Sequence, residues 1–263
     1  MKTRIISAVI AFMICIPILL MGGVIYDAGV VVLALLSLKE FLKVRQTKKE
    51  LPLFINFISY IILTLIVVNG LKTNGMIFSI DYRIVSALSL VFLIPTVLYH
   101  DRKLYSITDA FYLIGGVFFL GTSFSLLMII RNNNLLLLIY LFIITIITDT
   151  YAYTIGSLIG RHKMLEEISP NKTWEGMIFG TLFGVILASV YYIVVVDMSA
   201  NIPFVVFMTL FLSILGQFGD LVFSAIKRYF GTKDFSNIMP GHGGILDRLD
   251  SIIFVLLGYI FFI

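Results

Sequence analysis

The chain has 263 residues, of which 60% are hydrophobic and only 13% are charged. A soluble domain is typically about half apolar and a quarter charged, so this composition excludes an ordinary soluble globular protein and indicates an integral membrane protein. The mean hydropathy of +1.06 agrees with that class. The formal net charge of +4 follows the expected membrane topology, so it does not predict a nucleic-acid partner.

Apolar runs follow one another along the whole chain. A helix needs about 20 apolar residues to cross a bilayer. We therefore predict an all-α, polytopic membrane protein with about nine transmembrane helices, at 5–21, 23–38, 52–71, 84–99, 107–130, 135–155, 174–196, 202–226 and 245–263. The first run resembles a signal peptide, but further spans follow it, so we expect an uncleaved first helix.

The basic residues predict the orientation of these spans. With the N-terminus in the cytoplasm, all but Lys72, Arg83 and Arg131 of the 19 Lys and Arg residues fall in cytoplasmic segments. Such a bias is typical of cytoplasmic loops and supports an odd number of spans. We expect a multi-pass plasma-membrane protein with about five N-terminal helices in 1–135. About four helices in 136–263 would then carry an active site at the cytoplasmic face.

The segment LKEFLKVRQTKKELP, at 38–52, is strongly basic. We expect it to form a solvated cytoplasmic loop that rests on anionic lipid headgroups, since basic residues next to a span are attracted to them.

Ionisable side chains within a membrane span are costly and indicate function by default. Asp149 lies toward the cytoplasmic end of the span at 135–155, at the head of a seam of small residues. Such a seam, here Ala152, Gly156 and Gly160, lets two helices approach closely.

The segment ISPNKTWEG follows that span. Ser169-Pro170 predicts a turn. Lys172 offers a cationic donor for a phosphate group. Trp174 opens the next helix, as an interfacial anchor or as part of a substrate site.

The span at 202–226 carries one polar stripe at its cytoplasmic end. Its members are spaced by three and four residues and so share one helix face. They are Gln217, Asp220, Ser224 and Lys227, with Arg228 beside them. A single polar stripe on an apolar helix should face the protein interior or a wet cavity.

The last span begins with a second polar group. Asp247, Asp250 and Ser251 share one face of its first turns, and Gly243 and Gly244 precede them. A glycine-rich turn that leads into a helix N-terminus is suited to a phosphate. The alternative is that the carboxylates only complement the helix dipole and pair with Arg248.

These groups together predict a metal-dependent, phosphate-handling site at the cytoplasmic surface of the membrane. Carboxylates on facing helices, above all Asp220 and Asp247, can hold Mg²⁺ and leave positions open for substrate phosphates. Lysine and arginine side chains bind phosphates. We find no convincing Ser–His–Asp set, and none is needed if the attacking group is a phosphate oxygen that is already ionised.

The stretch SAIKRYFGTKDFSNIMPGHGGILDRLD, at 224–250, resembles the signature of the CDP-diacylglycerol synthases, also called phosphatidate cytidylyltransferases. SPNKTWEG at 169–176 and the nine-span layout are similar to further features of that family. Met239 departs from the usual Leu, Ile or Phe, which is a minor apolar exchange. The resemblance implies the reaction CTP + phosphatidate → CDP-diacylglycerol + pyrophosphate. It also implies Mg²⁺, with a second cation such as K⁺, and a homodimer.

The resemblance also implies roles for individual residues. Asp220 and Asp247 would be metal ligands, while Ser224, Lys227, Arg228, His242 and Asp250 would line the site. Ser169 and Lys172 would bind substrate phosphate or nucleotide. The span pattern adds Asp149 as a further metal candidate. Further substrate-binding candidates are Lys233, Arg248, Gly243 and Gly244. His242 would donate to a phosphate or act as an acid; the alternative is that it only holds the glycine turn.

Two other functions remain open at this point. A CTP-dependent lipid kinase would attack the γ-phosphorus and release CDP. An ion-coupled transporter would also carry charges within its spans, although such sites lie near the midplane between broken helices.

Overall fold

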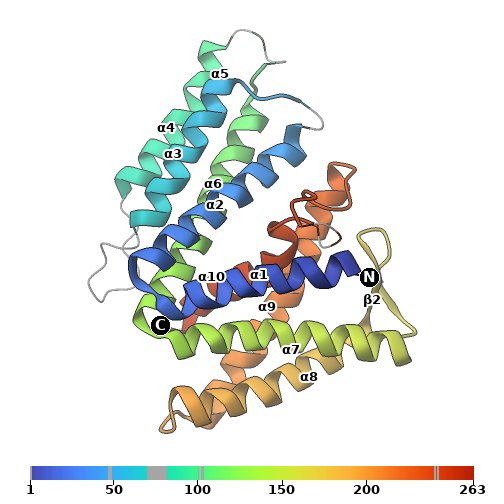
Figure 1. Cartoon of the computed structure of the whole chain (residues 1–263). Helices are drawn as coiled ribbons and strands as arrows, with labels where there is room; N and C mark the ends of the chain where they lie inside the picture. The colour runs from blue at the N-terminus through green and yellow to red at the C-terminus, as the bar shows by residue number, and fades with distance from the viewer. Residues whose placement is uncertain are drawn as a thin grey trace. The chain divides into compact units, whose positions relative to one another are not determined.

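The computed structural model describes residues 2–46, 49–69, 82–99, 101, 104–239, 241 and 243–263, with side chains from Val9 onward except Phe12 and Gln46. Lys72, His242 and the end of the predicted span at 52–71 lie outside the described residues. The described helices, labelled in Figure 1, are α1 (Lys2–Met21), α2 (Gly23–Gln46), α3 (Leu53–Asn69), α4 (Tyr82–Leu93), α5 (Pro95–Leu98), α6 (Ile107–Asn133), α7 (Leu135–Ile159), α8 (Trp174–Tyr191), α9 (Ile202–Tyr229) and α10 (Leu246–Tyr259). A π-helical turn, Tyr192–Val196, extends α8, and a 3₁₀ turn, Ile260–Phe262, follows α10.

Apolar helices dominate the described chain, which confirms a largely α-helical membrane protein. Four helical stretches are long and apolar enough to cross a bilayer: Ile107–Asn133, Leu135–Ile159, Trp174–Val196 and Ile202–Tyr229. Val9–Met21, Leu53–Asn69 and Tyr82–Leu98 are shorter apolar helices. The count of nine spans and the cytoplasmic N-terminus stay predictions.

Two local predictions were wrong. α2 continues to Gln46, so the first half of the basic segment at 38–52 is helical rather than a loop; Leu, Lys, Glu and Arg are all good helix formers. Ser169-Pro170 is not a turn but opens strand β2 (Ser169–Thr173), which pairs antiparallel with β1 (Lys163–Leu165). Proline is tolerated there because neither strand of a two-stranded sheet is central.

The chain divides into two units. One comprises 1–132 and 234–248, and the other comprises 133–233 and 249–263. We call them the first and the second unit and describe each by itself.

In the first unit, side-chain hydrogen bonds connect α2 and α6. The hydroxyl of Tyr112 donates to the carbonyl of Phe41 (3.1 Å), and the two rings stack with centroids 4.6 Å apart. The Tyr26 hydroxyl donates to the carbonyl of Leu127 (3.0 Å). Bonds at both ends of the contact therefore fix the position of α2 against α6, and α3 packs beside α2 (Figure 1).

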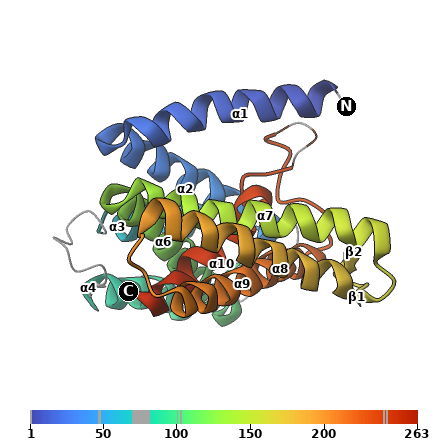
Figure 2. The same ribbon diagram turned by 90° about the horizontal axis from the view of Figure 1, so that it is seen from below.

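In the second unit, α7 and α8 lie side by side and α9 packs against both (Figure 2). A Cβ atom on Gly180 would come within 2.7 Å of the Thr148 carbonyl, and one on Gly156 would meet the Cα of Gly176 at 3.4 Å. A small residue is therefore needed at Gly180 of α8, while Gly156 of α7 lies in van der Waals contact with the backbone of α8. The predicted small-residue seam of α7 is thus confirmed as a helix–helix contact.

Candidate active site

The predicted site residues fall into two sets, one in each unit. The second unit carries Asp149 on α7, Ser169 and Lys172 on β2, Asp220, Ser224, Lys227 and Arg228 on α9, Lys233 after α9, and Asp250 on α10. The first unit carries Gly243, Gly244, Asp247 and Arg248. His242 lies outside the described residues.

The centre of the second unit's set is an ion pair between the hairpin and α9. Lys172 Nζ lies 2.7 Å from Asp220 Oδ2, and it also donates to the carbonyl of Gln217 (3.3 Å). The Ser224 hydroxyl, one turn along α9, donates to Asp220 Oδ1 (3.3 Å). The Lys172 and Asp220 side chains are 26% and 31% exposed, so an anion or a cation from solution can reach this pair.

Gln217 begins the polar stripe and faces the protein interior, as predicted. Its side-chain amide is buried and donates to the hydroxyl of Thr181 on α8 (2.8 Å). The stripe also extends further than predicted, because Thr209 and Ser213 precede Gln217 at spacings of four. Ser213 bonds Thr148 of α7 across 2.8 Å. Hydroxyl and amide groups thus tie α9 to both neighbouring helices, and the same spacing rule could have found them.

Asp250 brings a buried carboxyl group to the same unit. Its charge interacts with those of Asp220, Asp149 and Lys227. Asp250 and Lys227 are both buried, and Asp250 Oδ1 accepts the backbone N–H of Ser251 (2.8 Å). A Cβ on Gly219 would lie 2.8 Å from the Asp250 carbonyl, so glycine permits this segment to pack on α9.

Asp149, Asp220 and Asp250 are thus electrostatic neighbours, with Lys172 acting on Asp149 and paired with Asp220, and Lys227 acting on Asp250. Like charges near one another disfavour ionisation, and a nearby cation offsets that effect. The buried hydroxyl of Ser251 lies near the carboxyl group of Asp149 and acts on it as a hydrogen-bond donor.

The donor chemistry of this acidic group fits Mg²⁺, which prefers oxygen ligands. Among the described residues, no group of three or more His, Cys, Asp or Glu side chains, Asp149, Asp220 and Asp250 included, is placed so that it could hold a metal ion by itself. Mg²⁺ usually needs none, because one or two carboxylates and substrate phosphates complete its shell.

Arg228 links the end of α9 to the hairpin. Its Nε donates to the carbonyl of Ile168 and its Nη1 to that of Thr232, both at 3.3 Å. Its side chain is exposed, as is that of Lys233, whereas Ser169 is half-buried in β2. Exposed cations of this kind suit a substrate that arrives from solution.

In the first unit, Asp247 braces the turn that precedes α10. Its Oδ2 accepts the backbone N–H groups of Phe235 and Gly244, each at 2.9 Å. Gly243 has a φ of +83°, a conformation that other residues rarely adopt. A Cβ on Gly243 would also lie 2.9 Å from Asp247 Oδ2. Gly243 is therefore required by backbone geometry, and Asp247 supplies the local capping that the sequence left open as an alternative.

Glu40 of α2 was missed by the sequence analysis. Its side chain is buried and accepts the backbone N–H groups of Ile245 and Leu246, each at 2.9 Å, and the hydroxyl of Ser236 at 2.5 Å. The only signal was one acidic residue at the head of a basic segment.

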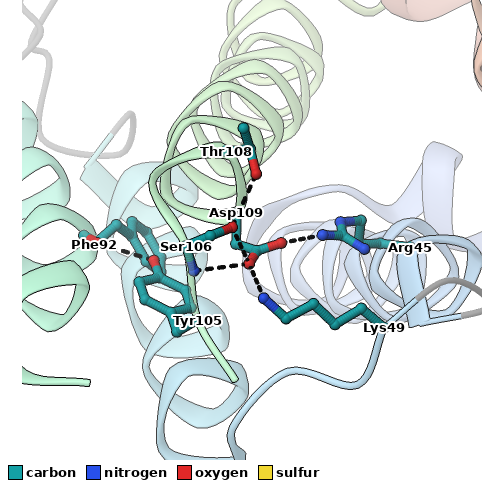
Figure 3. Close-up of polar contacts among 7 residues, drawn as sticks. All are labelled: Arg45, Lys49, Phe92, Tyr105, Ser106, Thr108 and Asp109. Atoms are coloured by element: carbon teal, nitrogen blue, oxygen red, sulfur yellow. Dashed lines mark hydrogen bonds and ion pairs between the residues drawn. The ribbon is translucent and has the colours of Figure 1, made fainter. Parts of the chain in front are cut away.

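A second missed feature is the buried Asp109. Two basic residues of the segment at 38–52 contact its carboxyl group (Figure 3). Arg45 forms an ion pair with its Oδ1, and Lys49 Nζ lies 2.5 Å from its Oδ2. The backbone and hydroxyl of Ser106 also donate to Oδ2. Arg45 and Lys49 are thus not the freely solvated charges that we predicted. Burial, with the nearby Asp109, raises the pKa of Tyr105, whose hydroxyl donates to the carbonyl of Phe92.

Comparison with known proteins identifies the family of the chain. The chain is 40% identical over 257 residues to a phosphatidate cytidylyltransferase of Staphylococcus haemolyticus, covering 97% of this chain and 96% of the relative. It is 39% identical over 259 residues to the enzyme of the same name from Staphylococcus aureus, with the same coverage. The Staphylococcus epidermidis enzyme is 40% identical over 257 residues, again with 97% and 96% coverage. A model of the cytidylyltransferase family matches residues 2–263, and the chain therefore belongs to that family.

Proposed function

We propose that the chain is a membrane-bound phosphatidate cytidylyltransferase, which converts CTP and phosphatidate to CDP-diacylglycerol and pyrophosphate. The observation that carries the proposal is the partly exposed ion pair of Lys172 and Asp220 between β2 and α9, with the buried Asp250 and Lys227 as electrostatic neighbours in the same unit. Relatives that are named for this activity are about 40% identical to the chain, and the similarity covers nearly their whole length.

In the proposed reaction, a phosphate oxygen of phosphatidate attacks the α-phosphorus of CTP. A new P–O bond forms, the bond from the α-phosphorus to the bridging oxygen breaks, and pyrophosphate leaves with that oxygen. Lys172, Lys227 and Arg228 offset the negative charge that builds on the leaving group, and fixed charges of this kind stabilise a transition state strongly. Lys172 exchanges its contact with Asp220 for a phosphate oxygen when CTP binds. Ser169 and Lys233 extend the phosphate contacts, as does Arg248.

Mg²⁺ is the proposed cofactor. Asp220, with Asp149 and Asp250 beside it, would hold the ion, and Asp247 remains a ligand candidate on the sequence pattern. The bound ion would neutralise phosphate charge. A second cation such as K⁺ is part of the same proposal, and so is an acid or donor role for His242.

We further propose nine spans in the plasma membrane, a cytoplasmic N-terminus, an active site that faces the cytoplasm, and a homodimer. The distribution of lysine and arginine along the sequence supports this orientation. At that depth a soluble nucleotide can meet a lipid headgroup.

Pyrophosphate release by the purified protein in detergent tests the proposed activity. We expect release only when CTP, phosphatidate and Mg²⁺ are all present. If no lipid phosphate that is tested supports pyrophosphate release, the proposal is overturned and a transport function is favoured.

A further inference from the structure

The carboxyl group of Glu40 contacts both ends of the segment that leads into α10. Only 1% of its surface is exposed. Glu40 Oε1 accepts from the hydroxyl of Ser236 and from the N–H of Ile245, while Oε2 accepts from the N–H of Leu246. Ile245 is 205 residues away in the chain, so this is a long-range contact inside the first unit.

The Glu40 carboxyl group accepts hydrogen bonds from backbone N–H groups at the N-terminus of α10. The first N–H groups of a helix have no partner within it, and the positive end of its dipole favours a carboxyl group. α10 begins at Leu246, so Glu40 bonds the first of these groups and the one before it. A residue of another helix thus acts as the cap of α10.

Gly244 permits this approach. A Cβ at Gly244 would lie 2.6 Å from either oxygen of Glu40, so any other residue would force the Glu40 carboxyl group to move. Asp247 adds an inner brace through the N–H groups of Phe235 and Gly244. Two carboxyl groups, one from α10 itself and one from α2, therefore hold the described residues Phe235, Ser236 and 244–246.

We propose that Glu40 is a positioning residue for cytidylyl transfer: it fixes the segment at 235–246 and the first turn of α10, and so the orientation of Asp247 and Asp250. Asp250 follows Asp247 by one turn of the same helix. The roles of these two aspartates rest on the proposed function. The hold of Glu40 on the segment does not, because it can be measured without any substrate.

The test compares Glu40→Gln with wild type in two measurements. Glutamine keeps the shape of the side chain but turns an N–H₂ group toward a backbone N–H or the Ser236 hydroxyl. We expect faster hydrogen exchange at Ile245 and Leu246. We also expect kcat to fall by roughly 10²-fold, the cost that a misplacement of about 1 Å can carry, with a much smaller change in KM for CTP.

Ser236→Ala is the second variant, since it removes one bond to Glu40 and leaves α2 intact. We expect a smaller fall in kcat for this variant. We also expect the double variant, Ser236→Ala with Glu40→Gln, to have a kcat no lower than that of Glu40→Gln alone. Asp109→Asn is the matched control, because Asp109 is a buried carboxyl group of the same unit that makes no described contact with this segment. It should lower thermal stability but leave kcat per folded protein and exchange at 235–246 unchanged.

The outcomes separate this inference from the proposed function. If Glu40→Gln folds and its hydrogen exchange at 235–246 equals that of wild type, the inference that Glu40 holds this segment is overturned. Faster exchange with unchanged kcat overturns the positioning role. Should Glu40→Gln fail to fold, Ser236→Ala decides: unchanged exchange and kcat overturn the inference. Wild-type protein without cytidylyl transfer refutes the proposed function, and the exchange data still report on Glu40.

Discussion

Replacement of Asp220 by asparagine probes the centre of the proposed site at little cost to the fold. The variant keeps the size of the side chain and removes the charge that pairs with Lys172 at 2.7 Å. Because 26% and 31% of the two side chains are exposed, the pair should contribute at most about 1 kcal/mol to the free energy of unfolding. For a chain of this length, that corresponds to a fall in Tm of about 2–4 °C.

The effect on turnover should be far larger. Asp220 is the proposed ligand that places Mg²⁺ against the phosphates, and loss of such an electrostatic contact typically costs about 10²–10³-fold in kcat. A 10²-fold loss corresponds to about 2.7 kcal/mol of transition-state stabilisation, well above the cost to folding. Activity and stability should therefore separate clearly in this variant.

The assay measures pyrophosphate release and thermal unfolding on the same detergent preparation. Asp197→Asn is a suitable control: hydrogen bonds from the hydroxyl and backbone of Ser199 lower the pKa of Asp197, so it too is charged at neutral pH. It should keep wild-type turnover. Near-normal activity of Asp220→Asn would refute the assignment of Asp220.

Four further results are expected. Lys172→Met should raise KM for CTP roughly tenfold, the equivalent of about 1.4 kcal/mol in binding, and an unchanged KM would remove Lys172 from nucleotide binding. Gly180→Val should lower the free energy of unfolding by about 1–3 kcal/mol, because its side chain would meet the Thr148 carbonyl; wild-type thermal unfolding would contradict the close contact of α7 and α8. Asp109→Ala leaves two partly buried cations without their shared partner and should cost about 2–3 kcal/mol, somewhat below the value for a fully buried pair; an unchanged Tm would count against this ion cluster. Treatment with EDTA should abolish turnover and added Mg²⁺ should restore it, whereas full activity in EDTA would exclude a required divalent ion.

Local spacing predicted the helical character of the chain and two features of single helices. The polar stripe of α9 could be recognised because residues three and four apart share a helix face, and the structure shows Gln217 buried against α8. The small-residue seam of α7 followed from the same kind of rule. In both cases the information lies within one helix.

The contacts of Glu40 and Asp109 could not be predicted in this way. Each joins segments that are far apart in sequence, 205 residues for Glu40 and Ile245 and 64 for Arg45 and Asp109. A basic segment next to a span ordinarily faces water or lipid headgroups, which is why Arg45 was expected to be solvated. Only the fold shows that buried carboxyl groups lie against this segment.

The strand that carries Lys172 was also beyond local reasoning. Ser169-Pro170 has the composition of a turn, and the pairing of Leu165 with Ser169 depends on a partner strand. That pairing matters for the proposed function, because β2 brings Lys172 to Asp220 of α9. Lys172 also contacts the Gln217 carbonyl, which is 45 residues away in sequence.

The most direct test of the central claim follows the phosphorus atoms of CTP. Purified protein is given phosphatidate, Mg²⁺ and CTP labelled on either the α- or the γ-phosphate. The account predicts that label enters the lipid only from the α position, while γ-label leaves as pyrophosphate. Label that reaches the lipid only from the γ position would instead show a CTP-dependent lipid kinase and would contradict cytidylyl transfer.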